Sequence, residues 1–167
     1  MRHLLGDYQL FKDGSGLVSL CEEVTLPDIK WKEEDYSGGG LIGTRQMKTI
    51  LEKLEVKAKS AGYEPELVSA VGQMPGMSQN YKIMASFIVP GGVEIPQKVL
   101  ITGAMSSLKR DAYKPGKSGT EYTISDITFY EEWFDGVLKF GIDLLNQKLV
   151  VDGVDLMAVR RRNTGRA

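Results

Sequence analysis

Three glycines carry the spacing that most resembles a chemical motif in this sequence, because Gly38, Gly40 and Gly43 satisfy the pattern G-x-G-x-x-G. In a dinucleotide-binding unit this pattern joins a buried strand to a helix, whose N-terminus holds the pyrophosphate. Here the charged run KEEDYS precedes the glycines and no helical pattern follows them. Gly116-Lys117-Ser118 imitates the end of a phosphate loop, but Asp111 stands where that loop requires a glycine. We therefore predict no bound cofactor.

The side chains that most often perform catalysis or bind metal ions are scarce or unsuitably spaced. His3 is the only histidine, which removes histidine-based triads and two-histidine metal sites. Neighbours in a strand point to opposite faces, so adjacent acidic residues form no catalytic dyad. Such pairs occur at Glu22-Glu23, Glu33-Glu34 and Glu131-Glu132. We interpret them as solvated or inter-subunit charges, and predict no catalytic residue, no metal site and no enzymatic activity.

The composition is that of an ordinary globular domain. The chain has 167 residues, of which 42% are apolar and 26% charged, and its formal net charge is −1. One domain with a sizeable core is expected at this length. The low net charge argues against a dedicated nucleic-acid binder, which usually carries a basic excess. No run approaches the ~18 apolar residues of a membrane span, and the first residues hold too short an apolar segment for a signal peptide. We expect synthesis in the cytoplasm and no membrane partner.

Strands are predicted along most of the chain, at residues 8–11, 17–25, 50–60, 81–89, 97–107, 121–134 and 137–144. Apolar and polar residues alternate clearly at 50–60, whereas the two faces are nearly balanced at 97–107 and of mixed polarity at 121–134. Pro65 at a first helical position, an apolar stripe and a closing Gly72 predict one short helix at about residues 65–71. A second helical turn is expected after Asp155. Seven or eight strands with so little helix predict a mainly β fold, an antiparallel β-sandwich or partly open barrel with the helix outside it.

Several local features refine this expectation. Asp-Gly pairs at 13–14, 135–136 and 152–153 predict tight hairpin turns. On the predicted strands, Ile50 and Leu144 are expected to face the core together with the other apolar residues of their alternations. The stretch 109–120 is rich in glycine and lysine and has no periodicity, so we expect an exposed, mobile loop.

A glycine-rich stretch that follows a charged strand is the clearest candidate for self-association. Glycine loses more conformational entropy on folding than any other residue, so a run of three indicates a use such as close approach to another backbone. We interpret residues 36–48 as an extended arm that contacts a second copy of the chain. The cluster from Arg160 to Arg162 is either a solvated tail or a contact with phosphate or an acidic subunit surface such as Glu33 or Glu34. The inter-subunit candidates are Trp31, Glu33, Glu34, Gly38, Gly39, Gly40, Leu41, Arg160, Arg161, Arg162 and Asn163.

Three stretches in the same order resemble the major tail tube proteins of contractile-tailed bacteriophages, a family that includes the tube proteins of R-type pyocins. VTLP at Val24 and DYSGGGLIG at Asp35 resemble the family's TLPKL and GGGM segments. YQLFKDG at Tyr8 resembles its opening strand, and DGVDLMAVRRRNTG at Asp152 resembles its C-terminal ending. The resemblance covers residues 1–167 as a single tail tube domain, although residues 62–104 match in pattern only.

The resemblance implies a structural protein without enzymatic activity. Such proteins form hexameric rings whose sheets join between subunits into a continuous barrel, and the rings stack into a hollow tube that conducts DNA into the host. The implied partners are further copies of the chain, the sheath, tail terminator and baseplate or initiator proteins, and the tape measure protein and DNA inside the tube, bound without sequence specificity. The implied location is the virion tail, assembled in the cytoplasm of the bacterial host.

Two alternative functions remain open. The chain could form the tube of a phage-derived bacteriocin or injection particle that carries no DNA, because the same fold serves both. It could also be a monomeric β-barrel that binds a ligand or nucleic acid. Trp31 and Trp133 do not favour the latter, since neither lies in the basic, aromatic-rich strand that stacks on bases.

A DNA conduit is expected to have an acidic or neutral lumen, because each lysine or arginine on a phosphate releases counterions and adds affinity. The 121–134 strand carries only acidic charges, so we predict that Glu121 and Asp126 face the lumen. The 50–60 strand carries Lys53, Lys57 and Lys59, and its basic face is expected on a different surface, at a subunit boundary or toward the sheath.

Overall fold

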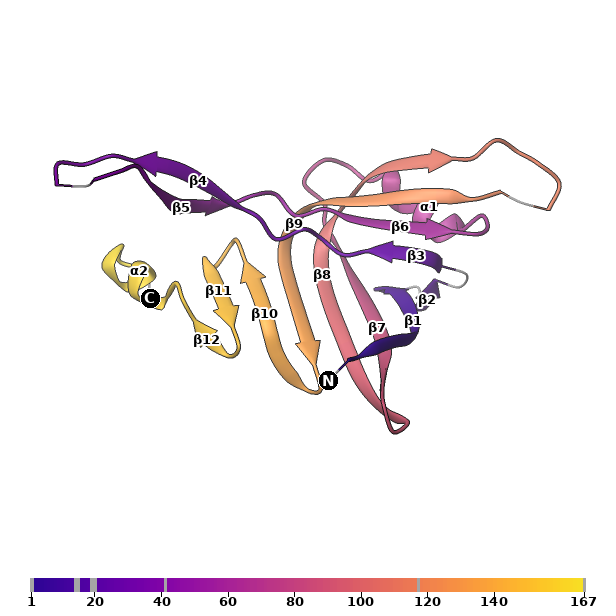
Figure 1. Ribbon diagram of the computed structural model, residues 1–167. Helices are drawn as coiled ribbons and strands as arrows, with labels where there is room; N and C mark the ends of the chain where they lie inside the picture. Colours follow the sequence, from indigo (N-terminus) through magenta and orange to yellow (C-terminus); the bar gives the residue numbers. More distant parts are fainter. Residues whose placement is uncertain (1, 14–15, 19–20, 41, 117, 167) are drawn as a thin grey trace.

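The computed structural model describes residues 2–13, 16–18, 21–40, 42–116 and 118–166. These residues form strands and two short helices, in the order shown in Figure 1. The strands are β1 (Leu4–Lys12), β2 (Gly16–Val18), β3 (Cys21–Thr25), β4 (Trp31–Tyr36), β5 (Arg45–Leu51), β6 (Val56–Ser60), β7 (Gln79–Val89), β8 (Val93–Arg110), β9 (Thr120–Phe134), β10 (Val137–Asp143), β11 (Lys148–Val151) and β12 (Val154–Asp155), and the helices are α1 (Pro65–Val71) and α2 (Ala158–Asn163). The predicted turn residue Gly14 and the candidate residue Leu41 lie outside the described residues.

Two long strands join the two layers of the molecule. The larger layer has the strand order β12-β11-β10-β9-β8-β7-β1-β2, and the smaller has the order β3-β6-β9-β8. β8 and β9 run through both layers, and each strand bends where it passes from the larger layer into the smaller one (Figure 1). All pairings are antiparallel. The predicted mainly β, antiparallel sandwich is confirmed, and within one chain the sheet is not closed into a barrel.

The bend of β8 and β9 is made by local irregularities in their ladder. The β8–β9 register shifts between Thr102 and Ala104 and again between Met105 and Ser107. On β9 the matching irregularity is Asp126, whose φ is 49°. At the bend Gly103 lies so close to β9 that a Cβ atom there would stand 2.9 Å from the carbonyl oxygen of Ser125. Bulges of this kind let a strand switch sheets, which closes the corner of a sandwich.

The core lies between the two layers and under α1. The largest fully buried side chains include Tyr81 on β7, Ile101 on β8, and Tyr122 and Tyr130 on β9. α1 matches the predicted helix in both bounds, with Pro65 at its start and Gly72 as its C-cap. A helix of about two turns is marginal alone, and α1 is held in place because it buries Leu67 and Ala70 in the core.

Two predicted strands are each divided in the structure. The 17–25 strand is β2, which pairs with β1, and β3, which pairs with β6. The 50–60 strand is β5, which ends at Leu51, and β6, which begins at Val56. Leu54, Val56 and Ala58 are buried as expected, but Ile50 is 63% exposed. The expectation for Ile50 was wrong because β5 belongs to a separate hairpin with no core beneath that part of it.

Smaller differences concern strand ends and counts. Leu144 is 52% exposed, so its predicted inward orientation is wrong: β10 ends at Asp143, whose carboxylate accepts hydrogen bonds from Asn146 in the following turn. Lys109 and Arg110 belong to β8, so the predicted loop is confined to residues 111–119. Its mobility stays a prediction. The described residues contain twelve strands rather than seven or eight, since two predicted strands are divided and the short strands β11 and β12 were not predicted.

Burial of tyrosines makes the stability of this fold sensitive to alkaline pH. Burial raises the pKa of Tyr81 to about 12 and also raises the pKa of Tyr130. The unfolded chain releases its tyrosine protons near pH 10, whereas the folded chain keeps the Tyr81 proton until about pH 12. Between these values deprotonation favours the unfolded chain, so the stability of the fold is unaffected below pH 10 and falls as the pH rises toward 12. We expect the free energy of unfolding to fall by about 1.4 kcal/mol per pH unit in this window for Tyr81 alone.

Urea unfolding between pH 8 and pH 12 measures this loss. A Tyr81→Phe variant should show a shallower decline with pH, whereas Tyr36→Phe, at an exposed tyrosine, should decline like wild type. A wild-type stability that stays constant from pH 10 to pH 12 contradicts the prediction.

Candidate assembly surfaces

The β4–β5 hairpin forms a sheet of its own and projects from the two-layer body (Figure 1). It corresponds to the predicted arm, which is therefore a regular hairpin with the glycines at its tip. Trp31 packs against the core at the base, while the other residues of β4 are exposed. Glu33 lies opposite Lys48 and Glu34 opposite Met47 in the ladder. A two-stranded hairpin is marginally stable in water alone. A projecting hairpin of this kind is typical of a segment that is stabilised by contact with another molecule.

The glycines at the tip differ in what their own chain requires of them. A Cβ at Gly38 would stand 2.8 Å from the Tyr36 hydroxyl oxygen. Gly40 has a φ of 93°, which side chains rarely adopt. Gly39 has neither constraint, since its φ is not positive and a Cβ there would meet no described atom within 4 Å. The backbone conformation thus accounts for Gly40. At Gly38 the close atoms belong to the end of an exposed tyrosine side chain that can move, and nothing within the described chain accounts for Gly39.

Exposed apolar side chains gather on the arm and around the C-terminal segment. On the arm they are Tyr36, Ile42, Met47 and Ile50, and near the C-terminus they are Leu144, Leu145, Val154, Leu156 and Val159. Between the two groups lies a groove of about 300 Å³, lined by Trp31, Leu51, Leu149 and Met157 among others. Single exposed apolar residues are common, but gathered ones mark interaction surfaces. The surface from the arm to α2 therefore has the character of an interface.

The arginines of the cluster on α2 differ in their contacts, and among the described residues Arg161 is the one whose side chain is bonded to its own chain. The Arg161 guanidinium donates to the Asp155 carboxylate at 2.6 Å and to the Gln147 carbonyl oxygen at 3.0 Å. The same carboxylate accepts the backbone N–H of Met157. Asp155 ends β12 and does not cap the helix expected after it, because the N-cap of α2 is Met157, which has no side-chain capping hydrogen bond. The hydrogen bond from Arg161 holds the pKa of Asp155 below its usual value. Arg161 thus fastens α2 to its own chain.

The other candidates on α2 lie at the surface, and Arg160 also lines the groove beside the arm. Arg160, Arg162 and Asn163 are exposed, and among the described residues neither arginine forms an ion pair. Both guanidinium groups are therefore available to a carboxylate of another molecule. The arm carboxylates Glu33 and Glu34 are likewise exposed. The predicted ion pair between α2 and the arm of another copy stays a prediction, and Arg160 and Arg162 are the arginines that could form it.

The predicted lumen residues lie at two different places on β9. Asp126 is exposed at the bend, and Glu121 lies in the smaller layer. Lys59 is the direct cross-strand partner of Glu121, because β6 pairs with β9. The expectation that the basic face of the 50–60 strand occupies a different surface was therefore wrong. The alternation of a strand shows its two faces but does not show which strand lies beside it.

Other features considered in the sequence have ordinary surroundings. The His3 ring packs edge-on against Phe134 with the ring centroids 5.2 Å apart. Trp133 donates its indole N–H to Glu131 and lies under the Lys98 ammonium. Within the described residues no group of three or more His, Cys, Asp or Glu side chains could hold a metal ion. None of the described helices has the length and apolarity to cross a membrane.

The fold is an antiparallel two-layer body with a projecting hairpin and a group of exposed apolar side chains, which is typical of a structural subunit that binds other chains. Comparison with known families defines it further: the model of phage tail tube protein FII matches residues 2–165, so the chain belongs to that family. It is 25% identical over 161 residues to the tail tube protein of Escherichia phage P2, covering 93% of each chain. It is also 26% identical over 151 residues to the major tail tube protein of Serratia phage KSP20, covering 89% of this chain and 87% of the other.

Solved structures share the fold at low sequence identity. One is a chain of the sheath–tube complex of an extracellular contractile injection system, PVC, in its extended state, with a TM-score of 0.57, 11% identity, and coverage of 75% of this chain and 87% of the other. Another is a chain of the tube-terminating cap of the anti-feeding prophage, with a TM-score of 0.52, 13% identity, and coverage of 71% and 82%. The resemblance found in the sequence is confirmed, and the chain is a tail tube protein of the contractile type.

Proposed function

We propose that this protein is the repeating subunit of a phage tail tube, built from stacked hexameric rings, through which DNA passes into the host. The observation that carries the proposal is the match of the phage tail tube family over residues 2–165. Both phage relatives support DNA as the cargo, since their tails belong to virions. The role is structural and involves no catalysis. The subunits are assembled in the host cytoplasm.

The uncovered surfaces of the subunit support its assembly into a tube. The arm, the groove beside it and the apolar C-terminal segment can be buried between copies. Sheets that continue from one subunit to the next also cover strand edges, which otherwise promote aggregation. A head-to-tail contact that closes by rotation makes a ring, and one that does not close stacks rings without limit.

The proposed partners beyond the tube follow from the same assignment. The similar PVC chain comes from a complex of sheath and tube, and other similar chains form a tube terminator and a cap. By analogy we propose a sheath around this tube, a terminator at one end and a baseplate or initiator at the other. The tape measure protein and DNA would occupy the lumen without sequence-specific contacts.

A second candidate function is the tube of an injection particle that carries no DNA. The fold of the PVC and anti-feeding prophage chains favours this candidate to a limited extent. The sequence relatives are phage proteins and favour the first. Capsid and terminase genes beside the coding gene distinguish the two, because only a DNA-carrying phage needs them.

Negative-stain electron microscopy of the purified chain, with size-exclusion chromatography, tests the proposed assembly. We expect rings or hollow filaments that elute ahead of the 18.5 kDa monomer. A chain that stays monomeric at high concentration contradicts the proposal and favours the monomeric binding module considered from the sequence.

Charge reversal at Arg162 tests the proposed contact between α2 and the arm of another copy. We expect Arg162→Glu to weaken assembly, and to do so most at low salt, where repulsion is least screened. The variant leaves the pair between Arg161 and Asp155 intact, so thermal unfolding of the monomer should not change. Assembly is followed by sedimentation at several salt concentrations.

A complementary reversal identifies the partner of Arg162. Adding Glu34→Arg to Arg162→Glu should restore assembly if the two residues face one another between copies. Assembly that responds neither to the first reversal nor to salt contradicts the contact.

A further inference from the structure

The smaller layer has two edges that no strand covers within the described chain. β3 pairs only with β6. At the opposite edge β7 accompanies β8 only as far as the pair of Gln79 and Gly103, so the remainder of β8 pairs only with β9. Figure 1 shows the two strands on opposite sides of this layer. Open strand edges present unpaired N–H and C=O groups that favour pairing with another chain.

The strand directions allow these two edges to join. The four strands alternate in direction, because β3 is antiparallel to β6, β6 to β9, and β9 to β8. β3 and β8 therefore run in opposite directions. When β8 of one copy lies beside β3 of the next, the new pair is antiparallel, and the alternation continues from copy to copy. A layer with an odd number of strands would not have this property.

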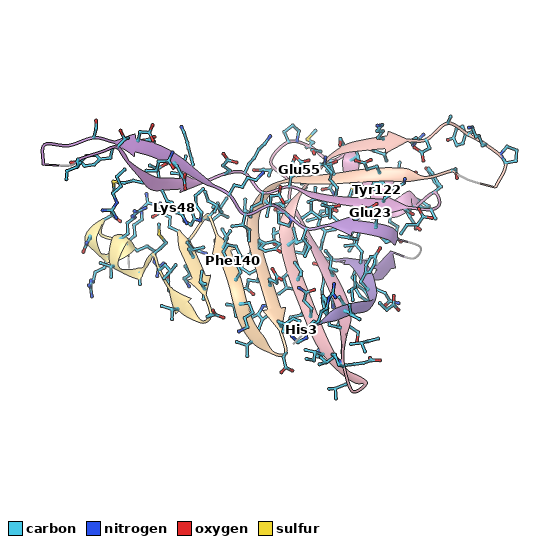
Figure 2. The ribbon with its side chains drawn as sticks, viewed as in Figure 1. His3, Glu23, Lys48, Glu55, Tyr122 and Phe140 are labelled. Carbon is cyan, nitrogen blue, oxygen red and sulfur yellow. The ribbon has the colours of Figure 1, made fainter. Side chains whose placement is uncertain are left out.

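A row of four charged residues crosses this layer from edge to edge. Glu23 on β3 is the register partner of Lys59, Lys59 is the partner of Glu121, and Glu121 is the partner of Lys109 on β8. All four lie on the face away from the core, because an adjacent residue on each strand packs toward the core: Val24, Ala58, Tyr122 and Leu108. Figure 2 labels Glu23 and Tyr122 within this layer. The charges alternate in sign along the row.

We propose that Lys109 of one copy pairs with Glu23 of the next, directly or across the diagonal that the stagger of a closed barrel introduces, so that alternating charges form a belt around the ring. This inference rests on the proposed ring and identifies the two strands and the residue pair that join its subunits. Opposite charges on neighbouring strands stabilise a sheet, and like charges destabilise it. The pair also restricts the register of the joint, because a long lysine side chain reaches a carboxylate directly opposite or on the diagonal but not one farther along β3.

The belt also determines the charge of the surface it occupies. Each copy contributes two lysines and two glutamates to it, so the belt has no net charge. If this face lines the lumen, Glu121 compensates its lysine neighbours, and DNA meets a neutral surface. A polyanion gains little affinity from such a surface, because each lysine is already paired with a carboxylate.

Complementation between two charge reversals tests the joint. Glu23→Lys places lysine opposite Lys109 at every joint, and Lys109→Glu places glutamate opposite Glu23. Each variant alone should require a roughly tenfold or higher protein concentration to form tubes. In an equimolar mixture, rings in which the variants alternate have opposite charges at every joint, so tubes should form near the wild-type concentration. The defects within each chain are the same alone and mixed, so only the joint can account for the recovery.

Lys57→Glu is a matched control on the same face, because β6 lies inside the layer and away from both edges. It should assemble like wild type. Circular dichroism of each variant establishes that the subunit is folded. A mixture that assembles no better than the single variants overturns the inference, as do single variants that assemble like wild type. Either result leaves the proposed function intact, which fails only when the wild-type chain forms no rings or tubes.

Discussion

A Gly103→Val variant is expected to lose about 3 kcal/mol of unfolding free energy, a typical cost of forcing side-chain atoms into a packed core. The added Cβ would stand 2.9 Å from the Ser125 carbonyl oxygen and 3.1 Å from side-chain carbons of Ile124 and Ile127. These atoms cannot easily move away, since two of the three residues are buried and the third is a register partner in the β8–β9 ladder. Both layers depend on this bend, so the whole subunit should be affected.

Urea unfolding of the monomer measures this effect. Gly62→Val is the matched control, because a Cβ at Gly62 meets no described atom within 4 Å and its φ is not positive. The control should stay within about 1 kcal/mol of wild type. If Gly103→Val is equally mild, the two strands can separate at the bend, and the close approach is not a constraint on the fold.

A Gly39→Val variant is expected to abolish tube formation without loss of monomer stability. Nothing within the chain requires glycine at this position, since a Cβ would meet open space. We therefore expect a side chain to be tolerated in the monomer and excluded only where the tip of the arm approaches a neighbouring copy. The effect should exceed that of a single charge reversal, because an overlap of atoms at an interface cannot be screened by salt.

Electron microscopy and sedimentation of Gly39→Val, beside urea unfolding, separate assembly from folding. The Gly62→Val variant serves again as control and should assemble, because it follows the end of β6 that points away from the arm (Figure 1). Tubes of normal length from Gly39→Val show that the tip is not an interface. A destabilised monomer shows instead that the glycine serves the hairpin itself.

The sequence alone was sufficient for the features that depend on neighbouring residues. The strand predicted at residues 121–134 matches β9 within one residue, and Pro65 with Gly72 predicted both ends of α1. The Asp-Gly pairs at 135–136 and 152–153 form turns in which both residues have positive φ. Each of these signals acts over a few residues, so tertiary context did not change them. The family was also evident from short motifs in a constant order.

Tertiary structure alone decided which strands lie side by side. The alternation of residues 50–60 continues through the point where the chain leaves the arm and enters the smaller layer, so it did not reveal the break after Leu51. Arg161 belonged to a uniform basic cluster in the sequence, but folding places Asp155 against it and leaves Arg160 and Arg162 exposed.

The candidate joint was hidden for the same reason. Lys109 was predicted to begin a loop, because the stretch 109–120 is rich in glycine and lysine and has no periodicity. Its place beside Glu121, and the place of Lys59 on the other side, follow from pairings between strands distant in the sequence. The alternation of side chains along a strand shows only which of its residues share a face. The neighbouring strand, the open edge and the charge row are set by long-range pairing, which the local pattern of side chains does not encode.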